Sequence, residues 1–373
     1  MNLLLYFIIL LVAVFVIHEI FKYILFYMYF HKTYPYVDKD YNPQPLSEED
    51  TNTITWIIHK YVPDHNAGSE WMAHEINQFL IKNMNYRVNV IADSSSINEF
   101  ERVNILERQN TLKNERFIKH SALILSHHTQ ESSAVTTANI IKRPIICLIH
   151  DDKRTENLQQ YIRLPYKKNI YLIYNSNWLK EYYSLFGFQG FVLYPPVFWR
   201  DYIVNTNREY VVLINCNSNK GGEVLIEIAK KMPDIKFMGV KGAYSKQHTS
   251  PNTPNLIYVP QTSYIKSIYE QTDILLMPSK EESWGRTAIE AMSSGIPVIA
   301  HPTPGLLESC GSAGIYCNRK SPDDWVREIR RLKTDTEYYK SVSEICKERA
   351  IYLDPTSKLK ELGRWLKTLK WQD

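Results

Sequence analysis

Short apolar runs recur along the chain at the spacing of a parallel α/β fold. Each run is only a few residues long, is rich in Ile, Val and Leu, and ends in a turn or loop, as buried parallel strands do. Amphipathic stretches with helical periodicity separate the runs. Strands that alternate with helices in this way indicate a parallel sheet. The predicted strands are residues 54–59, 88–92, 122–125, 145–149, 170–174 and 192–193, followed by 211–214, 235–238, 258–259, 274–277 and 298–300.

The predicted strands fall into two similar halves. A chain of 373 residues, 44% of them hydrophobic, is long enough for two domains that each bury a core. We place the first domain at residues 52–203 and the second at residues 204–354. A proline-containing linker, residues 33–51, precedes them, and a basic helix is expected within residues 355–373. Within the first domain, residues 93–121 are expected to be mostly helical.

Residues 1–32 are predicted to be a transmembrane anchor. Residues 3–17 are uninterruptedly apolar, and residues 20–30 continue the run with Lys22 as the only charge. Together they reach the ~20 residues that a spanning helix needs. A cleaved signal peptide is disfavoured because neither a basic start nor a small-residue cleavage site is visible. An alternative is that residues 20–30 form a separate helix that lies at the membrane interface.

Flanking charge predicts how this anchor is oriented. No Lys or Arg precedes the apolar run, whereas Lys22, Lys32 and Lys39 interrupt or follow it. The positive-inside tendency then places the rest of the chain in the cytosol, attached to the membrane by a single pass. The five scattered cysteines suit free thiols in a reducing compartment. With 44 basic residues against 40 acidic ones and no basic run, nucleic acid is not an expected partner.

Residues 273–305 carry the most informative pattern in the chain. A predicted buried strand at residues 274–277 is followed by a polar loop at residues 280–284. Gly285 then opens an amphipathic helix, and Gly295 ends it as a C-terminal cap. A strand-loop-helix-strand unit of this kind places ligands at the carboxyl ends of its strands.

Two carboxylates flank the start of the predicted helix. Glu282 lies in the loop before it and Glu290 lies on the helix itself. At Gly285, Arg286 and Thr287, free backbone N–H groups and the helix dipole favour an anion. Because carboxylates accept hydrogen bonds from vicinal hydroxyls, the pattern suits a phosphate with sugars on either side. An ordinary βαβ unit with solvated glutamates is the alternative that the spacing alone leaves open.

This stretch resembles the signature of retaining GT-B glycosyltransferases of family 4, the glycosyl transferases group 1. In that family, E-x7-E is followed by an A-M-x-x-G-x-P-V run. The chain has Glu282 and Glu290 at the first spacing, then Ala-Met at residues 291–292, Gly295, and Pro-Val at residues 297–298. The resemblance implies a GT-B fold, in which two Rossmann-like domains face a central cleft. The first domain would then hold the acceptor, the second would hold the donor, and the terminal helix would cross back to the first domain.

The resemblance also implies roles for individual residues. Glu290 is expected to bind the ribose hydroxyls and Glu282 the donor sugar. Lys220 precedes a glycine, as does the lysine that meets the diphosphate in the family, and His150 follows the strand after which the family places an active-site histidine. The expected catalytic residues are Glu282, His150 and Lys220, and the expected donor-binding residues are Glu290, Gly285, Arg286, Thr287, Ser283, Trp284, Asn215 and Gly68.

The chain departs from the family at one of these positions. Many relatives carry an arginine five residues before the loop lysine, where this chain has Asn215. Arg286 could supply the missing cation. Gly68 lies between the first strand and its helix, where a glycine lets a ligand approach the backbone, although a tight turn would also require one. His127 and His128 are expected to be structural residues at the end of a strand.

The expected function is a retaining transfer of a sugar from a UDP- or GDP-linked donor to a glycan or lipid-linked acceptor at a membrane. With the diphosphate charge neutralised by a lysine and a helix end, neither a metal nor another cofactor is required. Two alternatives remain open at this point. One is a catalytically silent GT-B domain that acts as a membrane scaffold, and the other is a GT-B sugar-nucleotide epimerase.

Overall fold

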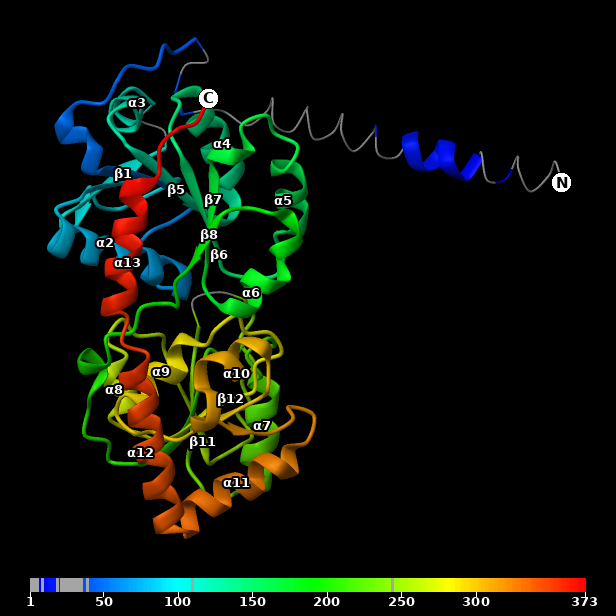
Figure 1. The fold of residues 1–373 in the computed structure, drawn as a ribbon. Coiled ribbons are helices and arrows are strands. Elements are labelled where there is room, and N and C mark those ends of the chain that lie inside the picture. The colour runs from blue at the N-terminus through cyan, green and yellow to red at the C-terminus, as the bar shows by residue number, and fades with distance from the viewer. Residues whose placement is uncertain are drawn as a thin grey trace.

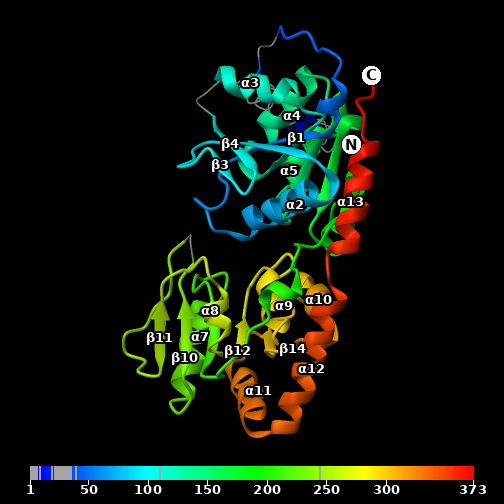
Figure 2. The ribbon, with the colours of Figure 1, turned by 90° about the vertical axis from the view of Figure 1, so that its left-hand side faces the viewer.

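The chain folds into two α/β domains stacked one above the other (Figure 1). A computed structural model describes residues 7, 10–17, 20, 36–37, 40–108, 111–242 and 245–373. The C-terminus returns to the N-terminal domain, so two helices near the end of the chain run along one side of both domains (Figure 2). The prediction of an α/β fold with two domains is confirmed.

The N-terminal domain is built on an eight-stranded, mostly parallel sheet. Its strands are β1 (Thr53–Ile58), β2 (Arg87–Ala92), β3 (Glu99–Phe100), β4 (Val103–Glu107), β5 (Leu123–His127), β6 (Ile145–Ile149), β7 (Ile170–Tyr174) and β8 (Gly190–Val192). Their spatial order is β3-β4-β2-β1-β5-β6-β7-β8, and β3 is the strand that runs antiparallel to its neighbour. The order reverses between β1 and β5, which makes the ends of these strands the ligand-binding edge expected of a doubly wound sheet.

Helices cover both faces of this sheet because alternate side chains of its strands point to opposite sides. Ile54, Trp56 and Ile58 of β1 enter one core, together with apolar residues of the helix that follows β1. Ile57 enters the other core, beneath the helices that follow β5, β6 and β7. The helices of this domain are α2 (Gly68–Met84), α3 (Thr111–Lys119), α4 (Glu131–Ile140), α5 (Thr155–Tyr161) and α6 (Asn177–Tyr182).

The C-terminal domain repeats the same plan on a six-stranded, fully parallel sheet around a single core. Its strands are β9 (Tyr210–Ile214), β10 (Phe237–Val240), β11 (Leu256–Val259), β12 (Thr272–Met277), β13 (Val298–Ala300) and β14 (Ile315–Tyr316). Their order is β11-β10-β9-β12-β13-β14, so the reversal falls between β9 and β12. The helices of this domain are α7 (Gly222–Lys231), α8 (Lys266–Tyr269), α9 (Arg286–Met292), α10 (Pro304–Cys310), α11 (Pro322–Thr334) and α12 (Thr336–Tyr352). The last helix of the chain, α13 (Thr356–Thr368), follows α12 and leaves this domain.

Helix α13 belongs to the core of the N-terminal domain. Leu359, Leu362 and Leu366 are buried there together with apolar residues of α2. Burial of each leucine stabilises the packing by roughly 1.5–3 kcal/mol. Gly363 faces Met84 of α2 so closely that a Cβ atom at this position would clash with the methionine sulfur. The chain therefore begins and ends its folded part in the same domain.

The expectation that residues 93–121 are mostly helical is wrong in part. Residues 99–107 form the β3–β4 hairpin, and the described helix in this stretch is α3. Val103 and Ile105 are buried on one face of β4, which is the two-residue alternation of a strand. Glu101 and Arg102 make the turn with positive φ angles of 46° and 67°. The strand is too short for its alternation to stand out beside the polar residues around it.

The predicted anchor lies largely outside the described residues. Residues 10–17 are helical, and their apolar side chains are exposed. Within the part of the chain that the structure describes, no helix is both long and apolar enough to cross a membrane.

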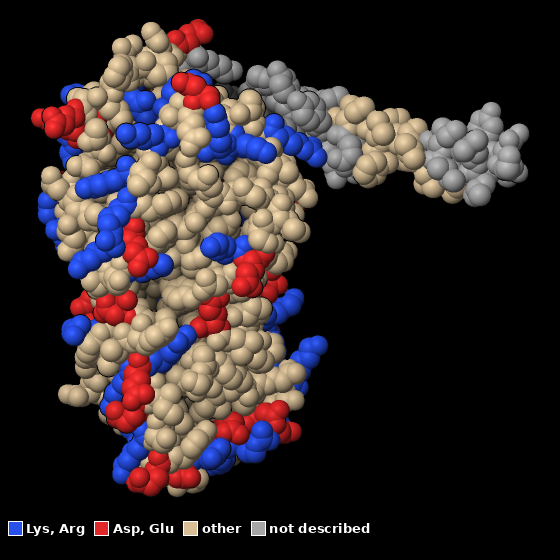
Figure 3. Space-filling model, in the orientation of Figure 1, with Lys and Arg blue, Asp and Glu red and all other residues tan. Residues whose placement is uncertain are grey.

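The described part of the predicted linker packs against the N-terminal domain. Tyr36 is buried, and its backbone N–H donates to Oγ1 of Thr137 at 3.1 Å. Asp50 accepts hydrogen bonds from Arg87 at 3.0 Å and from His120 at 2.9 Å. Over the face shown in Figure 3, basic and acidic side chains are interspersed, with the basic ones gathered mainly over the N-terminal domain.

Candidate functional site

A cleft of about 690 Å³ separates the two domains where the strand order of each sheet reverses. The N-terminal wall is formed by the ends of β5 and β6 and by the start of α2. The C-terminal wall is formed by the loops after β9 and β12 and by the start of α9. Every residue that the sequence analysis assigned to the site lines this cleft: Gly68, His150, Asn215, Lys220, Glu282, Ser283, Trp284, Gly285, Arg286, Thr287 and Glu290.

Glu282 and Lys220 form an ion pair on the C-terminal wall of the cleft. Glu282 comes from the loop after β12, and its Oε2 also accepts a hydrogen bond from Oγ of Ser279 at 3.2 Å. Both charged side chains are largely buried, with 12% of the Glu282 side chain and 21% of the Lys220 side chain exposed. The pair therefore places a cation and a carboxylate side by side, one suited to a phosphate and the other to sugar hydroxyls.

The loop that carries Lys220 is shaped by hydrogen bonds and by glycine. The backbone N–H of Lys220 donates to Oδ1 of Asn217 at 2.9 Å. Gly221 follows with a φ of +89°, and a Cβ atom there would lie 2.6 Å from Cγ of Pro278. Asn215, where the resemblance leads us to expect an arginine, also has a positive φ, and its Oδ1 accepts a hydrogen bond from Gln247 at 3.2 Å. Asn215 thus stabilises the loop by hydrogen bonds and supplies no charge.

Glu290 is buried and accepts hydrogen bonds from two residues of its own domain. Its Oε1 accepts from Nε of Arg286 at 2.6 Å, one turn earlier on α9, and its Oε2 accepts from the hydroxyl of Tyr269 at 2.8 Å. Each carboxylate oxygen has a second lone pair, so these bonds leave acceptor capacity for a ligand. Burial raises the pKa of Tyr269 well above its ordinary value, and the charge of Glu290 adds to that shift.

Arg286 links the two domains across the cleft. Its Nη2 donates to the hydroxyl of Tyr202 at 2.7 Å, in the segment that joins the domains, and lies 3.6 Å from Oε1 of Glu75 on α2. Burial lowers the pKa of Arg286, but Tyr202, Glu290 and Glu75 outweigh that effect and raise the pKa overall. Burial raises the pKa of Glu75, with Arg286 opposing it. The guanidinium is thus held by these three groups, and its compensating role at the donor phosphates stays a prediction.

The residues around the start of α9 shape the backbone and the contact between domains. Ser283 Oγ accepts from Nδ2 of Asn175 at 2.9 Å, and its carbonyl accepts from Nε1 of Trp178 at 2.7 Å. The indole of Trp284 is buried and stacks on Tyr194 at a centroid distance of 5.4 Å. Gly285 has a φ of +94°, and a Cβ atom there would lie 2.6 Å from Leu306. Trp284 and Gly285 therefore fix the loop against the core.

Thr287 and Gly68 are the least constrained residues of the predicted site. The hydroxyl of Thr287 lies 3.8 Å from the sulfur of Met277, a weak contact that a ligand oxygen can replace. Gly68 begins α2 without a positive φ, and a Cβ atom added to it would meet nothing within 4 Å. No strained turn therefore requires glycine at position 68. The space beside it is open toward the cleft, as the approach of a ligand to the backbone would need.

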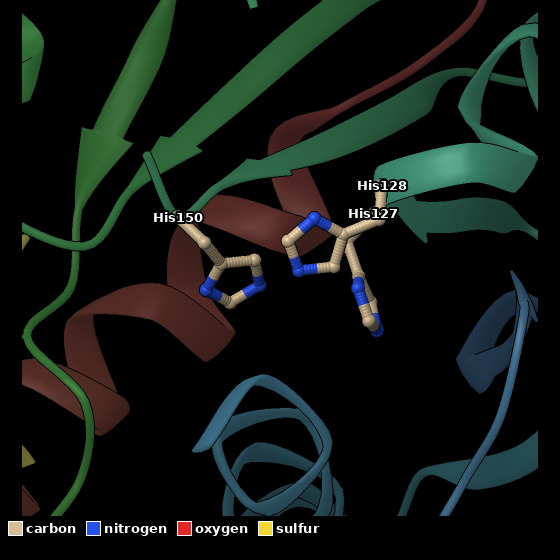
Figure 4. Close-up of side chains that lie close together, drawn as sticks. All are labelled: His127, His128 and His150. Carbon is tan, nitrogen blue, oxygen red and sulfur yellow. The ribbon is translucent and has the colours of Figure 1, made fainter. Parts of the chain in front are cut away.

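Three histidines meet on the N-terminal wall. His127 ends β5, His128 follows it, and His150 follows β6 (Figure 4). The ring of His150 stacks on that of His128 at a centroid distance of 5.1 Å and meets that of His127 edge-on at 5.2 Å. Burial lowers the pKa values of His127 and His150 well below the ordinary value, and the neighbouring His128 lowers both further. The three rings form one cluster beside the cleft.

Contacts between the domains border the cleft on more than one side. Nζ of Lys153 donates to Oε2 of Glu281 at 2.9 Å, linking the loop after β6 to the loop after β12. Nε2 of Gln261 donates to the carbonyl of Asn66 at 2.9 Å. Both walls therefore contribute to one site.

Two partners of the site escaped the sequence analysis. Tyr269 precedes the motif, in the short helix α8, and reaches Glu290 only through the fold. Glu75 belongs to the other domain. Neither lies in a motif, and both look like ordinary helix residues, so no signal in one sequence identifies them.

The second half of the chain matches a known family. Residues 204–349 match the family described as Glycosyl transferases group 1. A D-inositol 3-phosphate glycosyltransferase of Corynebacterium aurimucosum is 29% identical over 151 residues, which is 35% of this chain and 36% of that protein. The enzyme of the same name from Streptomyces bingchenggensis is 42% identical over 69 residues, or 18% of this chain and 15% of that protein. The chain therefore aligns with about a third or less of these relatives.

Solved structures resemble the chain over both domains. HepE of Anabaena, solved in complex with UDP and glucose, has a TM-score of 0.68 at 16% identity, and the match covers 85% of this chain and 99% of HepE. Sucrose-phosphate synthase of Thermosynechococcus elongatus has a TM-score of 0.67 at 14% identity and covers the same shares. The chain thus has a GT-B-like two-domain fold, and its C-terminal domain carries the group 1 glycosyltransferase match.

Proposed function

We propose that this protein is a retaining glycosyltransferase of family 4. It would move a sugar from a UDP- or GDP-linked donor to a glycan or lipid-linked acceptor. The observation that carries the proposal is the meeting of Lys220, Glu282 and Glu290 in one cleft between two doubly wound domains. These residues come from separate segments of the donor-side domain, and the arrangement suits a diphosphate flanked by a ribose and a second sugar.

Each of the three side chains has a distinct task in this proposal. Glu290 holds the ribose through the acceptor capacity that Arg286 and Tyr269 leave open. Lys220 moves from Glu282 to the diphosphate, where it stabilises the negative charge that grows on the leaving group. Glu282, released from the lysine, accepts hydrogen bonds from the donor sugar. Since Lys220 and the amides at the start of α9 neutralise the diphosphate, the transfer requires no divalent metal there.

His150 belongs to the opposite wall and would face the sugar from the acceptor side. Its carbonyl accepts from Nδ2 of Asn175 at 3.3 Å, and the same amide donates to Ser283 beside Glu282. Asn175 therefore ties the histidine loop to the carboxylate loop across the cleft. Retention by front-face transfer is part of this proposal, and it needs the leaving diphosphate and the acceptor hydroxyl on the same side of the sugar.

The membrane is proposed as the place of the reaction. The support is the apolar stretch at residues 3–30, of which residues 10–17 are described as helical with exposed apolar side chains. An enzyme held there by a single pass and a lipid-linked acceptor would both be confined to the plane of the membrane, which favours their encounter. The orientation expected from the flanking lysines puts the cleft on the cytosolic side.

A donor screen tests the activity. The purified full chain is incubated with UDP- and GDP-linked sugars without acceptor, and slow release of free sugar is measured. We expect one donor to be hydrolysed, with the released sugar retaining the anomeric configuration of the donor. A chain that binds no nucleotide sugar and hydrolyses none would contradict the proposal.

A further inference from the structure

We propose that His127, His128 and His150 form a binding site for a zinc ion on the N-terminal wall of the cleft. One ring nitrogen from each residue lies within 4.8 Å of the others. Tetrahedral Zn–N bonds of about 2.0–2.1 Å require ligand nitrogens roughly 3.3 Å apart, so the rings must close in by side-chain rotations of modest size. Three imidazoles leave a fourth position open on a tetrahedral zinc. All three histidines line the cleft.

Three buried ring nitrogens of the cluster have no hydrogen-bond partner among the described residues. Within the described part of the chain, neither ring nitrogen of His127 has a hydrogen-bond partner, although the residue is 1% exposed. Nε2 of His150 is likewise buried and unpartnered. Buried polar atoms are almost always paired, because leaving one unpaired costs about 1–3 kcal/mol. A metal ion that takes these lone pairs would remove that cost.

The backbone is arranged to bring consecutive histidines to the same place. Successive side chains of a strand point to opposite faces, so His127 and His128 would normally diverge. His128 has a φ of +56°, a conformation that is uncommon for residues other than glycine, and this breaks the alternation. Both rings consequently lie next to His150, whose own position follows from the parallel pairing of β5 with β6. Strained backbone of this kind is typical of ligand sites.

Charged residues of both signs surround the cluster. Glu131 is fully buried at the start of α4, three residues after His128, and Asp151 follows His150 directly. Glu70 lines the same cleft. The opposing cation is Arg154, whose Nη2 donates to Nδ1 of His128. Asp151 lies only 3.7 Å from Nε of Arg154 and offers the guanidinium another partner when the histidine binds metal.

Imidazole ligands and a tetrahedral geometry suit zinc best among common cellular metals. The ion would be separate from the diphosphate, because Lys220 and Glu282 belong to the other domain. A role for the open position rests on the proposed function: it would take the acceptor hydroxyl or water. The site itself does not depend on that activity.

Metal content measures the site directly. The full chain is stripped with a chelator, dialysed against zinc, freed of loose metal by gel filtration and analysed by mass spectrometry. We expect about one zinc per chain in the parent and at least tenfold less in His128→Ala and His150→Gln. His59→Ala is the matched control, since His59 lines the same cleft but pairs with Asp93, and it should keep the zinc. Cobalt in place of zinc should give the visible absorption of a tetrahedral site, lost in the same two variants.

A second variant tests the competing hydrogen bond. Arg154→Met removes the donor to His128 and should bind zinc more tightly than the parent in a chelator competition. Circular dichroism of the stripped proteins shows which variants fold, and only folded variants are compared. A parent that retains no zinc, or a folded His128→Ala that retains as much zinc as the parent, overturns the site. Either result leaves donor binding by Lys220 and Glu290 untouched, so the failure of this inference is distinguishable from failure of the proposed function.

Discussion

Nε of Arg286 lies 2.6 Å from Oε1 of Glu290, one turn along the same short helix, and both side chains are largely buried. The same guanidinium reaches Tyr202 between the domains and Glu75 in the other domain. The carboxylate that we propose to bind the ribose is therefore held in place by an arginine that also contacts the segment between the domains and the N-terminal domain. This relationship makes Arg286 a structural partner of the site.

Arg286→Ala should lower the free energy of unfolding by about 3 kcal/mol, because it leaves the buried Glu290 and the partly buried Glu75 without their cation. Arg330→Ala is the matched control, since Arg330 pairs with Asp234 where both side chains are about half exposed, and the expected loss is much smaller. Urea denaturation of both variants measures the difference. Equal losses would show that the Arg286 cluster contributes no more than a surface ion pair.

Lys220→Ala should weaken the binding of UDP or GDP while leaving the bare nucleoside almost unaffected. A charge-assisted hydrogen bond contributes roughly 1.5–3 kcal/mol, which corresponds to about a ten- to hundredfold loss of affinity. Calorimetry with nucleoside and nucleoside diphosphate separates the two contributions. If both ligands lose affinity equally, Lys220 acts through the loop structure and not through the phosphates.

Stability should depend on pH through Glu131, whose pKa burial raises to about 7 while Arg154 opposes the shift. Because the folded state holds this proton more tightly than the unfolded state, stability is lost as the pH rises from about 4.5 through 7. The rise from the ordinary value of 4.5 to about 7 corresponds to about 3 kcal/mol over the whole titration. Glu131→Gln lacks this dependence, so its stability relative to the parent should rise by about 2.5 kcal/mol between pH 5 and pH 8. A pH-independent difference in urea denaturation would contradict the account.

The orientation at the membrane is tested with a tag at the C-terminus. In sealed microsomes the tag should be accessible to protease from the cytosolic side. The lysines that follow the apolar run favour the cytosol for the chain on that side of the membrane. If deletion of residues 1–32 also releases the tagged protein into the soluble fraction, that segment acts as a membrane anchor. Protection of the tag inside the vesicles would contradict the predicted orientation.

The parts of the site that follow from sequence are those built from contiguous residues. Glu282 and Glu290 lie in one strand-loop-helix unit, so their spacing already fixes their positions relative to the helix start. The same holds for the strands, whose apolar runs are local signals. The β3–β4 hairpin is short and lies among polar residues, so its alternation of Val103 and Ile105 gives too little signal.

Other parts of the site depend on chain segments that meet only in the folded protein. Tyr269 contacts Glu290 across 21 residues of sequence, and Glu75 reaches Arg286 from the other domain. His127 and His128 are recognisable as residues at a strand end, but the positive φ of His128 that gathers them beside His150 leaves no trace in the sequence. Side-chain pairing and backbone strain are products of the tertiary fold.

The most direct test of the central claim separates the two carboxylates by calorimetry. Glu290→Gln should weaken both the nucleoside diphosphate and the intact nucleotide sugar, because both carry the ribose, by about 1.5–3 kcal/mol. Glu282→Gln should leave the affinity for the nucleoside diphosphate nearly unchanged and reduce turnover of the intact donor. If both variants fold normally and bind nucleotide and donor as the parent does, the cleft does not hold a nucleotide sugar in the proposed way.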